Sequence, residues 1–373
     1  SRRTDMNRHK LTASVLILTI LLVTGLLIIT MPGNAYSETE NRVLSEKPQL
    51  SLAEIMSGSF QKKLDKYLSD QFPGRNNLMQ LGTKIKLLSG RRDIENTYIG
   101  KDNYFFEKIT DADIDEKNYR KNLGRIESLA DKYDEIKFTT MLVPSSGVVL
   151  SDKLPDNAEF YDAEKLYQVA DQAFANVKLT DPTEEMIMAK DDYIYYKTDH
   201  HWTTYGSYIG YRSLMGEAAV YEYSARETDV VSDSFLGTLY SRTLDDRAVP
   251  DSVELVDISD EIEVIVDGES GAVYDYEALN EKDQYRVFFG GNYGLTEINN
   301  CQGEGTLLIL KDSFANSMVP FLTTDYGKIV MIDLRYYAGS VSGLLEAGDI
   351  DEVLVLYEIN NFASDTNLAK LVL

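Results

Sequence analysis

The chain alternates short apolar runs with segments of helical character. Five runs rich in apolar residues predict strands: 136–143, 177–180, 306–310, 328–333 and 353–357. Helical patterns lie before and between them: 52–69, 76–89, 113–133, 162–176, 203–219, 315–322 and 340–346. Apolar strands that alternate with helices predict an α/β fold, in which a buried, mostly parallel sheet carries helices on both faces.

Four other features complete this outline. Residues 98–100 and 104–106 predict a short hairpin, and 193–197 predicts a strand that leads into a histidine-containing motif. Residues 220–290 are acidic and rich in valine and isoleucine, which predicts an inserted β-rich segment. Residues 32–50 are polar and predict a linker. We therefore expect one large domain over 51–373, with the β-rich insertion at 220–290.

The N-terminal segment differs from the rest in both charge and apolarity. Residues 1–10 carry a net charge of +3 and 11–35 carry none, so the remainder sums to −24 − 3 = −27. An uncharged apolar run at 11–31, after a basic tail at 1–10, predicts a transmembrane anchor with a cytoplasmic tail and an extracytoplasmic body. A cleaved signal peptide is the alternative, with small residues at 33–35 as the cut site. Both interpretations export the body.

The acidic composition and the cysteine count exclude some classes of function. A body with a charge of −27 repels nucleic acid, so we expect no nucleic-acid partner. Cys301 is the single cysteine, which rules out an intrachain disulfide and a metal site built from several cysteines.

Ser313 is the best-placed nucleophile in the sequence. The apolar run 306–310 stops at Lys311 and Asp312, and a predicted helix follows Ser313. Such a strand-to-helix turn raises a serine at the carboxyl edge of the sheet, where the N–H groups of the helix start can stabilise an oxyanion. The alternative is that Ser313 or Asp312 only caps the helix.

The segment 197–202 supplies a base for this serine. The chain has three histidines, and His200 and His201 are the two outside the basic tail. If the segment is extended, Asp199 and His201 point the same way and His200 points opposite, which favours His201 as the base and Asp199 as its orienting acid. A structural histidine and a metal site built from Asp199, His200 and His201 are the alternatives. Because adjacent residues rarely chelate one ion, we expect no metal.

A glycine-rich stretch at 290–294 is the third candidate. Gly291 lets the backbone approach a ligand, and the amide of Asn292 can donate to an oxyanion. A glycine turn after a strand needs no function, which is the alternative.

These segments together resemble a known family, the DHHW proteins, which belong with alginate O-acetyltransferases of the AlgX/AlgJ type in the SGNH-hydrolase-like superfamily. The motifs that carry the resemblance are TDHHW at 198–202, KDSF at 311–314, NRVL at 41–44, FPGR at 72–75, IGKDNY at 99–104 and FLGT at 235–238. The resemblance implies a three-layer, flavodoxin-like fold and a catalytic triad of Ser313, His201 and Asp199. Gly291, Asn292 and Asp312 are then the candidates for substrate or oxyanion binding.

The resemblance also implies an activity. We expect an extracytoplasmic O-acetyltransferase or acetyl esterase that forms an acetyl-serine and uses no cofactor. The expected acceptor is a cell-surface or exported polysaccharide, and a membrane-bound O-acyltransferase would pass the acetyl donor across the membrane. A polysaccharide-binding or assembly protein without catalysis is the alternative.

Overall fold

The computed structural model describes residues 2–30, 33–37, 39–223 and 228–372. Parts of the predicted segments at 11–31, 32–50 and 220–290 therefore fall outside the described residues. The chain divides into two compact units, which are Ser1–Gly90 with Thr243–Asp246, and Arg91–Arg242 with Arg247–Leu373. The second unit holds the large sheet and every candidate site residue.

The first unit consists of helices and one short hairpin. Helix α1 covers Arg2–Thr30, and strands β1 (Tyr36–Ser37) and β2 (Arg42–Val43) pair antiparallel. Helices α2 (Leu52–Ser57), α3 (Ser59–Asp70) and α4 (Arg75–Leu88) follow. The helix predicted at 52–69 is broken at Gly58, whose φ of 76° lies in the left-handed region that glycine adopts without steric cost.

The membrane-spanning helix predicted at 11–31 is not found. Helix α1 passes through the basic tail as well as the uncharged run. Across the ranges that the structure describes, no helix combines the length and the apolarity needed to cross a membrane.

The second unit is built on a mixed sheet of eight strands in the order β11-β10-β12-β14-β13-β15-β6-β7. The last five of these strands are parallel: β14 (Lys328–Ile332), β13 (Thr306–Lys311), β15 (Glu352–Glu358), β6 (Lys137–Val143) and β7 (Val177–Thr180). The other three, β12 (Leu295–Asn299), β10 (Glu263–Val266) and β11 (Glu269–Gly271), extend it antiparallel. The five predicted strands are thus confirmed, in a sheet that is mixed.

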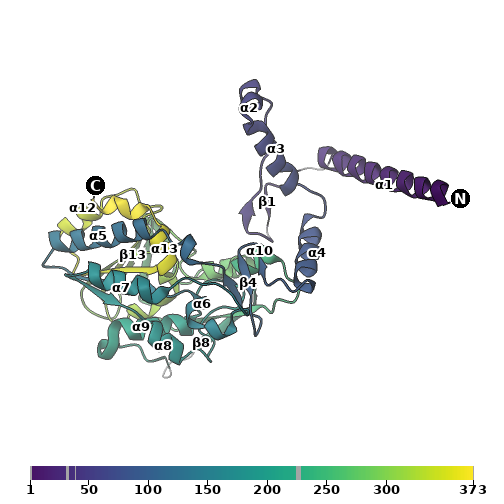
Figure 1. Cartoon of the computed structure of the whole chain (residues 1–373). Helices are drawn as coiled ribbons and strands as arrows, with labels where there is room; N and C mark the ends of the chain where they lie inside the picture. Colours follow the sequence, from purple (N-terminus) through teal and green to yellow (C-terminus); the bar gives the residue numbers. More distant parts are fainter. Residues whose placement is uncertain (1, 31–32, 38, 224–227, 373) are drawn as a thin grey trace. The chain divides into compact units, whose positions relative to one another are not determined.

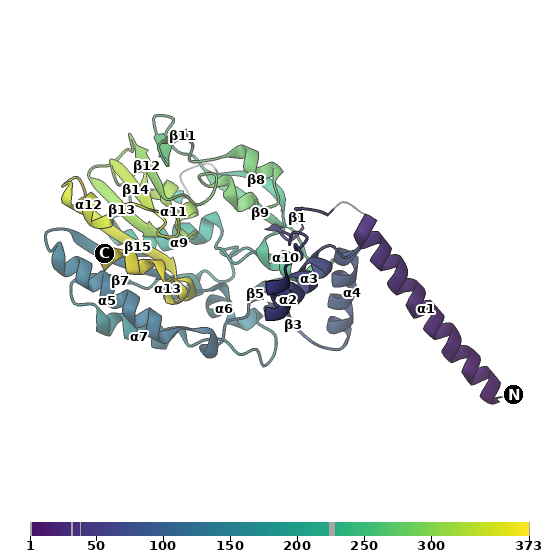
Figure 2. The same cartoon turned by 90° about the horizontal axis from the view of Figure 1, so that it is seen from above.

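Helices cover both faces of this sheet (Figures 1 and 2). Alternate residues of β13 show why, since Leu307 and Ile309 belong to one apolar core and Leu308 and Leu310 to the other. The second core includes buried residues of four helices: α5 (Glu116–Lys132), α7 (Ala163–Ala173), α12 (Val341–Glu346) and α13 (Ile359–Ser364). The first core includes residues of α6 (Ser146–Val149), α8 (Thr183–Met188), α9 (Thr204–Met215) and α11 (Ala315–Leu322).

Smaller strands lie outside the main sheet. The predicted hairpin is confirmed as β4 (Thr97–Ile99) and β5 (Phe105–Glu107), joined by β3 (Asp93–Ile94). In the 220–290 segment, β8 (Thr228–Phe235) and β9 (Asp251–Val256) form a separate antiparallel pair with α10 (Thr238–Thr243) between them, whereas β10 and β11 join the main sheet.

Candidate active site

Ser313 lies in the turn between β13 and α11, at the carboxyl edge of the parallel strands. Its side chain is half-buried. The turn is fixed by Asp312, whose Oδ1 accepts from the Phe314 N–H at 2.9 Å and whose Oδ2 accepts from the Glu358 N–H and from Asn361 Nδ2, both at 2.9 Å. The nucleophile candidate therefore sits on a turn anchored to β15 and α13.

The histidine motif forms a compact loop, so the strand predicted at 193–197 is wrong. An isolated bridge joins Tyr195 to Trp202, and the residues between them turn back on themselves. Buried Asp251 holds this loop, because its carboxylate accepts from the N–H groups of Lys197 and Thr198 at 2.7 and 2.8 Å and from the Thr198 hydroxyl at 2.5 Å. These N–H groups are then unavailable to a neighbouring strand.

Asp199, His201 and Ser313 lie in one row of hydrogen bonds. His201 Nδ1 is 2.6 Å from Asp199 Oδ1, and His201 Nε2 is 2.7 Å from Ser313 Oγ. Asp199 Oδ1 also accepts from the His201 N–H at 3.1 Å, which is a turn contact rather than the strand alternation that the sequence suggested. This geometry lets a carboxylate orient an imidazole whose other nitrogen faces a hydroxyl, while the catalytic roles remain predictions.

The second carboxylate oxygen of Asp199 is held by the start of α10. Asp199 Oδ2 accepts from the Thr238 N–H at 2.7 Å. Gly237 precedes this residue, and a Cβ there would stand 2.3 Å from the Cβ of Asp199 and 2.5 Å from Oδ2. Only glycine fits so close to the carboxylate without a shift.

Aromatic rings fix the imidazole from the side. The Tyr285 ring stacks on His201, with centroids 3.8 Å apart and an angle of 10° between the planes. The Tyr285 hydroxyl donates to the Ser313 carbonyl at 3.0 Å, so this one side chain touches both His201 and the turn that holds Ser313. Trp202 Nε1 donates to the Phe314 carbonyl at 3.0 Å and ties the two motifs together a second time.

The electrostatics of the site favour a neutral imidazole beside an ionised carboxylate. Burial, together with the charge of His200, lowers the pKa of His201 from 6.5 to about 4. Burial opposes ionisation of Asp199, but the two histidines and its hydrogen bonds outweigh it and hold the pKa of that carboxyl well below its usual range. At neutral pH, His201 is therefore free to accept a proton from Ser313.

His200 lies next to the hydrogen-bonded series of Asp199, His201 and Ser313 but makes no hydrogen bond to it. Its ring centroid is 4.0 Å from that of His201, and its Nδ1 is 3.5 Å from Asp199 Oδ1. That Nδ1 is buried and has no hydrogen-bond partner within the described part of the chain. Ligand atoms of Asp199, His200 and His201 lie within 4.8 Å of one another, as a metal site needs. Both ring nitrogens of His201 already face Asp199 and Ser313, so a metal there would displace one of these contacts.

Lys311 is buried directly beneath the glycine-rich stretch. Its Nζ is 2.8 Å from Asn292 Oδ1 and 2.7 Å from Asn316 Oδ1, and burial lowers its pKa from 10.5 to about 8. An ammonium can only donate, so both amides must turn their oxygens to it. Asn316 Nδ2 then donates to the Gly291 carbonyl at 3.3 Å. The Nδ2 group of Asn292 makes no hydrogen bond among the described residues, which leaves it available to an oxyanion.

Gly291 and Asp312, the other two residues predicted to bind substrate or an oxyanion, have hydrogen bonds inside the fold instead. The Gly291 N–H donates to the Phe288 carbonyl at 3.3 Å, so it is not free for an oxyanion. Asp312 is 2 % exposed and both its carboxylate oxygens are used inside the fold, which makes it an anchor of the turn. The Ser313 N–H is the better donor, since it donates no hydrogen bond within the described parts of the chain.

Sequence reasoning missed four contributors to the site: Gly237, Thr238, Asp251 and Tyr285. Gly237 and Thr238 carried a signal, because they belong to the FLGT motif of the family resemblance. Asp251 and Tyr285 lie in the β-rich segment without a recognisable local pattern.

The fold has solved relatives. A DHHW family protein from Eubacterium siraeum DSM 15702 matches with a TM-score of 0.64 and 20 % identity, over 74 % of this chain and 95 % of that one. Bacillus cereus PatB1 matches with a TM-score of 0.60 and 22 % identity, over 71 % and 97 %. PatB1 with a sulfonyl adduct gives 0.57 and 21 %, over 72 % and 97 %. The O-acetyltransferase domain of Pseudomonas putida AlgJ is more distant, at 0.45 and 16 %, over 74 % and 98 %.

The sequence comparisons identify the family. A search of curated proteins gives no significant match. The family model described as DHHW protein matches residues 40–159 and 162–332, well over half of the 373 residues. The protein therefore belongs to the DHHW protein family.

Proposed function

We propose that this protein is an extracytoplasmic O-acetyltransferase, or an acetyl esterase, that acts on polysaccharide through an acetyl-serine on Ser313. The observation that carries the proposal is the row in which His201 Nε2 lies 2.7 Å from Ser313 Oγ and His201 Nδ1 lies 2.6 Å from Asp199 Oδ1. Membership of the DHHW protein family supports the proposal, and so does the α/β fold, which we interpret as SGNH-hydrolase-like.

Acetyl transfer to the serine follows from this geometry. His201 Nε2 takes the proton of Ser313 as its Oγ attacks the acetyl carbonyl, and Asp199 stabilises the resulting imidazolium. The Ser313 N–H and Asn292 Nδ2 supply donors for the negative oxygen of the tetrahedral intermediate. His201 then gives its proton to the departing alkoxide, and an acetyl-serine remains.

The second half returns the enzyme to its starting state. His201 takes a proton from an acceptor hydroxyl, whose oxygen attacks the acetyl carbon, and Ser313 recovers the proton as it leaves. A sugar hydroxyl gives transfer and water gives hydrolysis. The proposed donor is an acetyl group handed across the membrane by a membrane-bound O-acyltransferase. The basic tail followed by an uncharged run, the pattern of an export signal, supports an exported body.

Ser313→Ala tests the proposal with 4-nitrophenyl acetate as substrate. We expect turnover to fall to background, whereas the matched change Ser270→Ala at an exposed position of β11 should leave it unchanged. His201→Ala should lose about 10²–10⁴-fold, and His200→Ala far less, because only His201 contacts the serine. Equal losses from the two histidines would reject the assignment of the base.

Two further measurements separate the alternatives. PatB1 has been solved with a sulfonyl adduct. A sulfonyl fluoride should likewise add mass to the peptide that contains Ser313, and none in Ser313→Ala. Absence of both turnover and labelling in the parent protein would leave a polysaccharide-binding role without catalysis. Mass gain on an oligosaccharide supplied with an acetyl donor identifies a transferase, and free acetate alone identifies an esterase.

A further inference from the structure

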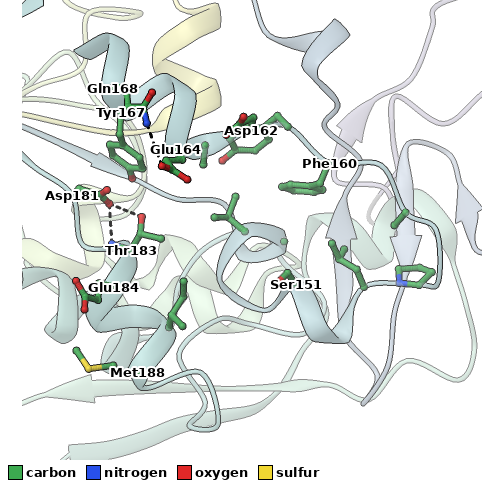
Figure 3. Close-up of a pocket in the computed structure, with 18 of the residues that line it drawn as sticks. Ser151, Phe160, Asp162, Glu164, Tyr167, Gln168, Asp181, Thr183, Glu184 and Met188 are labelled. Carbon is green, nitrogen blue, oxygen red and sulfur yellow. Dashed lines mark hydrogen bonds between the residues drawn. The ribbon is translucent and has the colours of Figure 1, made fainter. Parts of the chain in front are cut away.

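A cavity of about 1210 Å³ lies beside β6 and β7 and does not contain Ser313. Its walls come from α6 (Ser146–Val149), α7 and α8, together with the segment that joins α6 to α7. Figure 3 shows the residues that line it, with Phe160 on one side and Asp181 and Thr183 on another. None of these residues has a part in the proposed acetyl-transfer step.

The cavity and Ser313 belong to the same edge of the sheet. Strands β13, β15, β6 and β7 are parallel neighbours, and the chain that leaves each of them emerges at the carboxyl edge. Ser313 follows β13, Gly147 follows β6 and Asp181 follows β7. Neighbouring strands lie about 4.8 Å apart, so the ends of β6 and β7 are roughly 10 and 14 Å from that of β13. The cavity wall and the turn of Ser313 therefore both begin at the carboxyl ends of neighbouring strands.

A buried chain of hydrogen bonds joins the cavity wall to the nucleophile turn. Tyr161 lines the cavity, and its hydroxyl is 2.8 Å from Ser145 Oγ, which donates to Glu358 Oε1 at 2.6 Å. The Glu358 N–H donates to Asp312 Oδ2 at 2.9 Å, and Asp312 holds the turn of Ser313. The wall and the serine are therefore parts of one rigid polar framework.

The residues that line the cavity include several acidic and polar side chains. Four exposed carboxylates line it: Asp162, Glu164, Asp181 and Glu184. Gln168 Nε2 donates to Glu164 Oε1 at 3.2 Å, while the Asn157 amide and the half-buried ring of Phe160 add a hydrogen-bonding group and an apolar face. Among the described residues, no lysine or arginine lines it. Carboxylates bind amines and hydroxyls and repel uronates and phosphates.

We propose that this cavity is an acceptor subsite for a glycan that carries amino sugars. The inference rests on the proposed function, because it assigns a substrate class to the same edge of the sheet. Sugar units beyond the acetylated one occupy the cavity, where Glu164 and Glu184 hold their ammonium groups. Polymers of uronic acids are excluded from it by charge.

The double variant Glu164→Gln/Glu184→Gln tests the subsite. Both side chains are exposed, and amides of equal size keep the fold intact. We expect the KM for acetyl transfer to glucosamine oligomers to rise on the order of tenfold, since charged hydrogen bonds are lost. Turnover of 4-nitrophenyl acetate should not change, because this small ester does not reach the cavity. The matched control is Asp134→Asn/Glu135→Gln, which removes the same charge ahead of β6, at the opposite edge.

Direct binding separates failure of the subsite from failure of catalysis. Calorimetry with Ser313→Ala should show glucosamine oligomers binding more tightly than N-acetylglucosamine oligomers, and oligouronates not binding. The same titration on Ser313→Ala combined with the double variant should lose this preference. Unchanged affinity, or equal binding of oligouronates, overturns the subsite whether or not the parent turns over 4-nitrophenyl acetate. Loss of ester turnover in the parent overturns only the acetyl-transfer proposal.

Discussion

Replacing Lys311 with methionine should reduce the rate of ester turnover far more than it changes the stability of the fold. Lys311 is 2 % exposed and is the charged donor to Asn292 and Asn316. Methionine has a similar length and no donor. The Oδ1 of Asn292 then keeps only the longer contact from Asn316 Nδ2 at 3.3 Å, so its Nδ2 group, the proposed oxyanion donor, is held less firmly.

The structure sets the magnitudes. Burial lowers the pKa of Lys311 from 10.5 to about 8, which corresponds to a cost of about 3 kcal/mol for keeping it charged in the folded protein. Because the unfolded chain binds the proton more tightly, this cost is full below pH 8 and disappears between pH 8 and 10.5. Methionine removes that cost but leaves the buried oxygen of Asn316 without its donor, a penalty of about 1–3 kcal/mol. The two effects oppose each other, so the free energy of unfolding should change by no more than about 2 kcal/mol.

The rate of ester turnover, unlike the free energy of unfolding, is not changed by two opposing effects. Loss of one oxyanion donor lowers kcat by about 10²–10³-fold. We would measure kcat with 4-nitrophenyl acetate from pH 6 to 10 and the free energy of unfolding by urea denaturation. The parent rate should also decline above about pH 8, as Lys311 loses its proton, and the variant should lack this limb. The control is Lys137→Met, at an exposed ion pair with Glu352, which should alter neither quantity by much.

Two outcomes would refute this reasoning. A rate within threefold of the parent would mean that Asn292 is oriented without Lys311 or does not contact the oxyanion. A large loss of stability together with the lost rate would assign Lys311 to the fold rather than to the site.

Three further predictions concern His201 and Asp199. Gly237→Ala should cost about 1–3 kcal/mol of stability and lower ester turnover at least tenfold, because the new Cβ would stand 2.3 Å from the Cβ of Asp199. The matched change Gly124→Ala, whose Cβ would have nothing within 4 Å, should stabilise α5 by about 0.5–1 kcal/mol. An unchanged rate of ester turnover in Gly237→Ala would contradict the close approach. The pH profile of kcat/KM should fall on the acid side near pH 4, where His201 gains its proton, and a limb at pH 6.5 or above would show that His201 is not buried as described. For the same reason, the stability that comes from a neutral His201 should be complete above pH 6.5 and lost as the pH falls toward 4.

The sequence by itself determined the elements that depend on local pattern. Apolar runs and their turns were sufficient for the central strands, since a strand buried on both faces reads as a continuous apolar run. The same reasoning placed Ser313 between β13 and α11, where the chain must leave the sheet at its carboxyl edge. The pairing of Asp199 with His201 was also foreseen, although from an extended strand and not from the turn that Asp251 holds.

Only the tertiary structure decided what surrounds these residues. Tyr285 on the imidazole, Gly237 against the carboxylate and Asn292 on Lys311 all join positions far apart in the chain, and neither hydrophobic periodicity nor residue spacing carries information about such contacts. Asp312 is a second example of what residue order along the chain does not predict. Its place before the serine suggested a role in binding, and the fold buried it as an anchor instead, because three donors from the turn, β15 and α13 converge on its carboxylate.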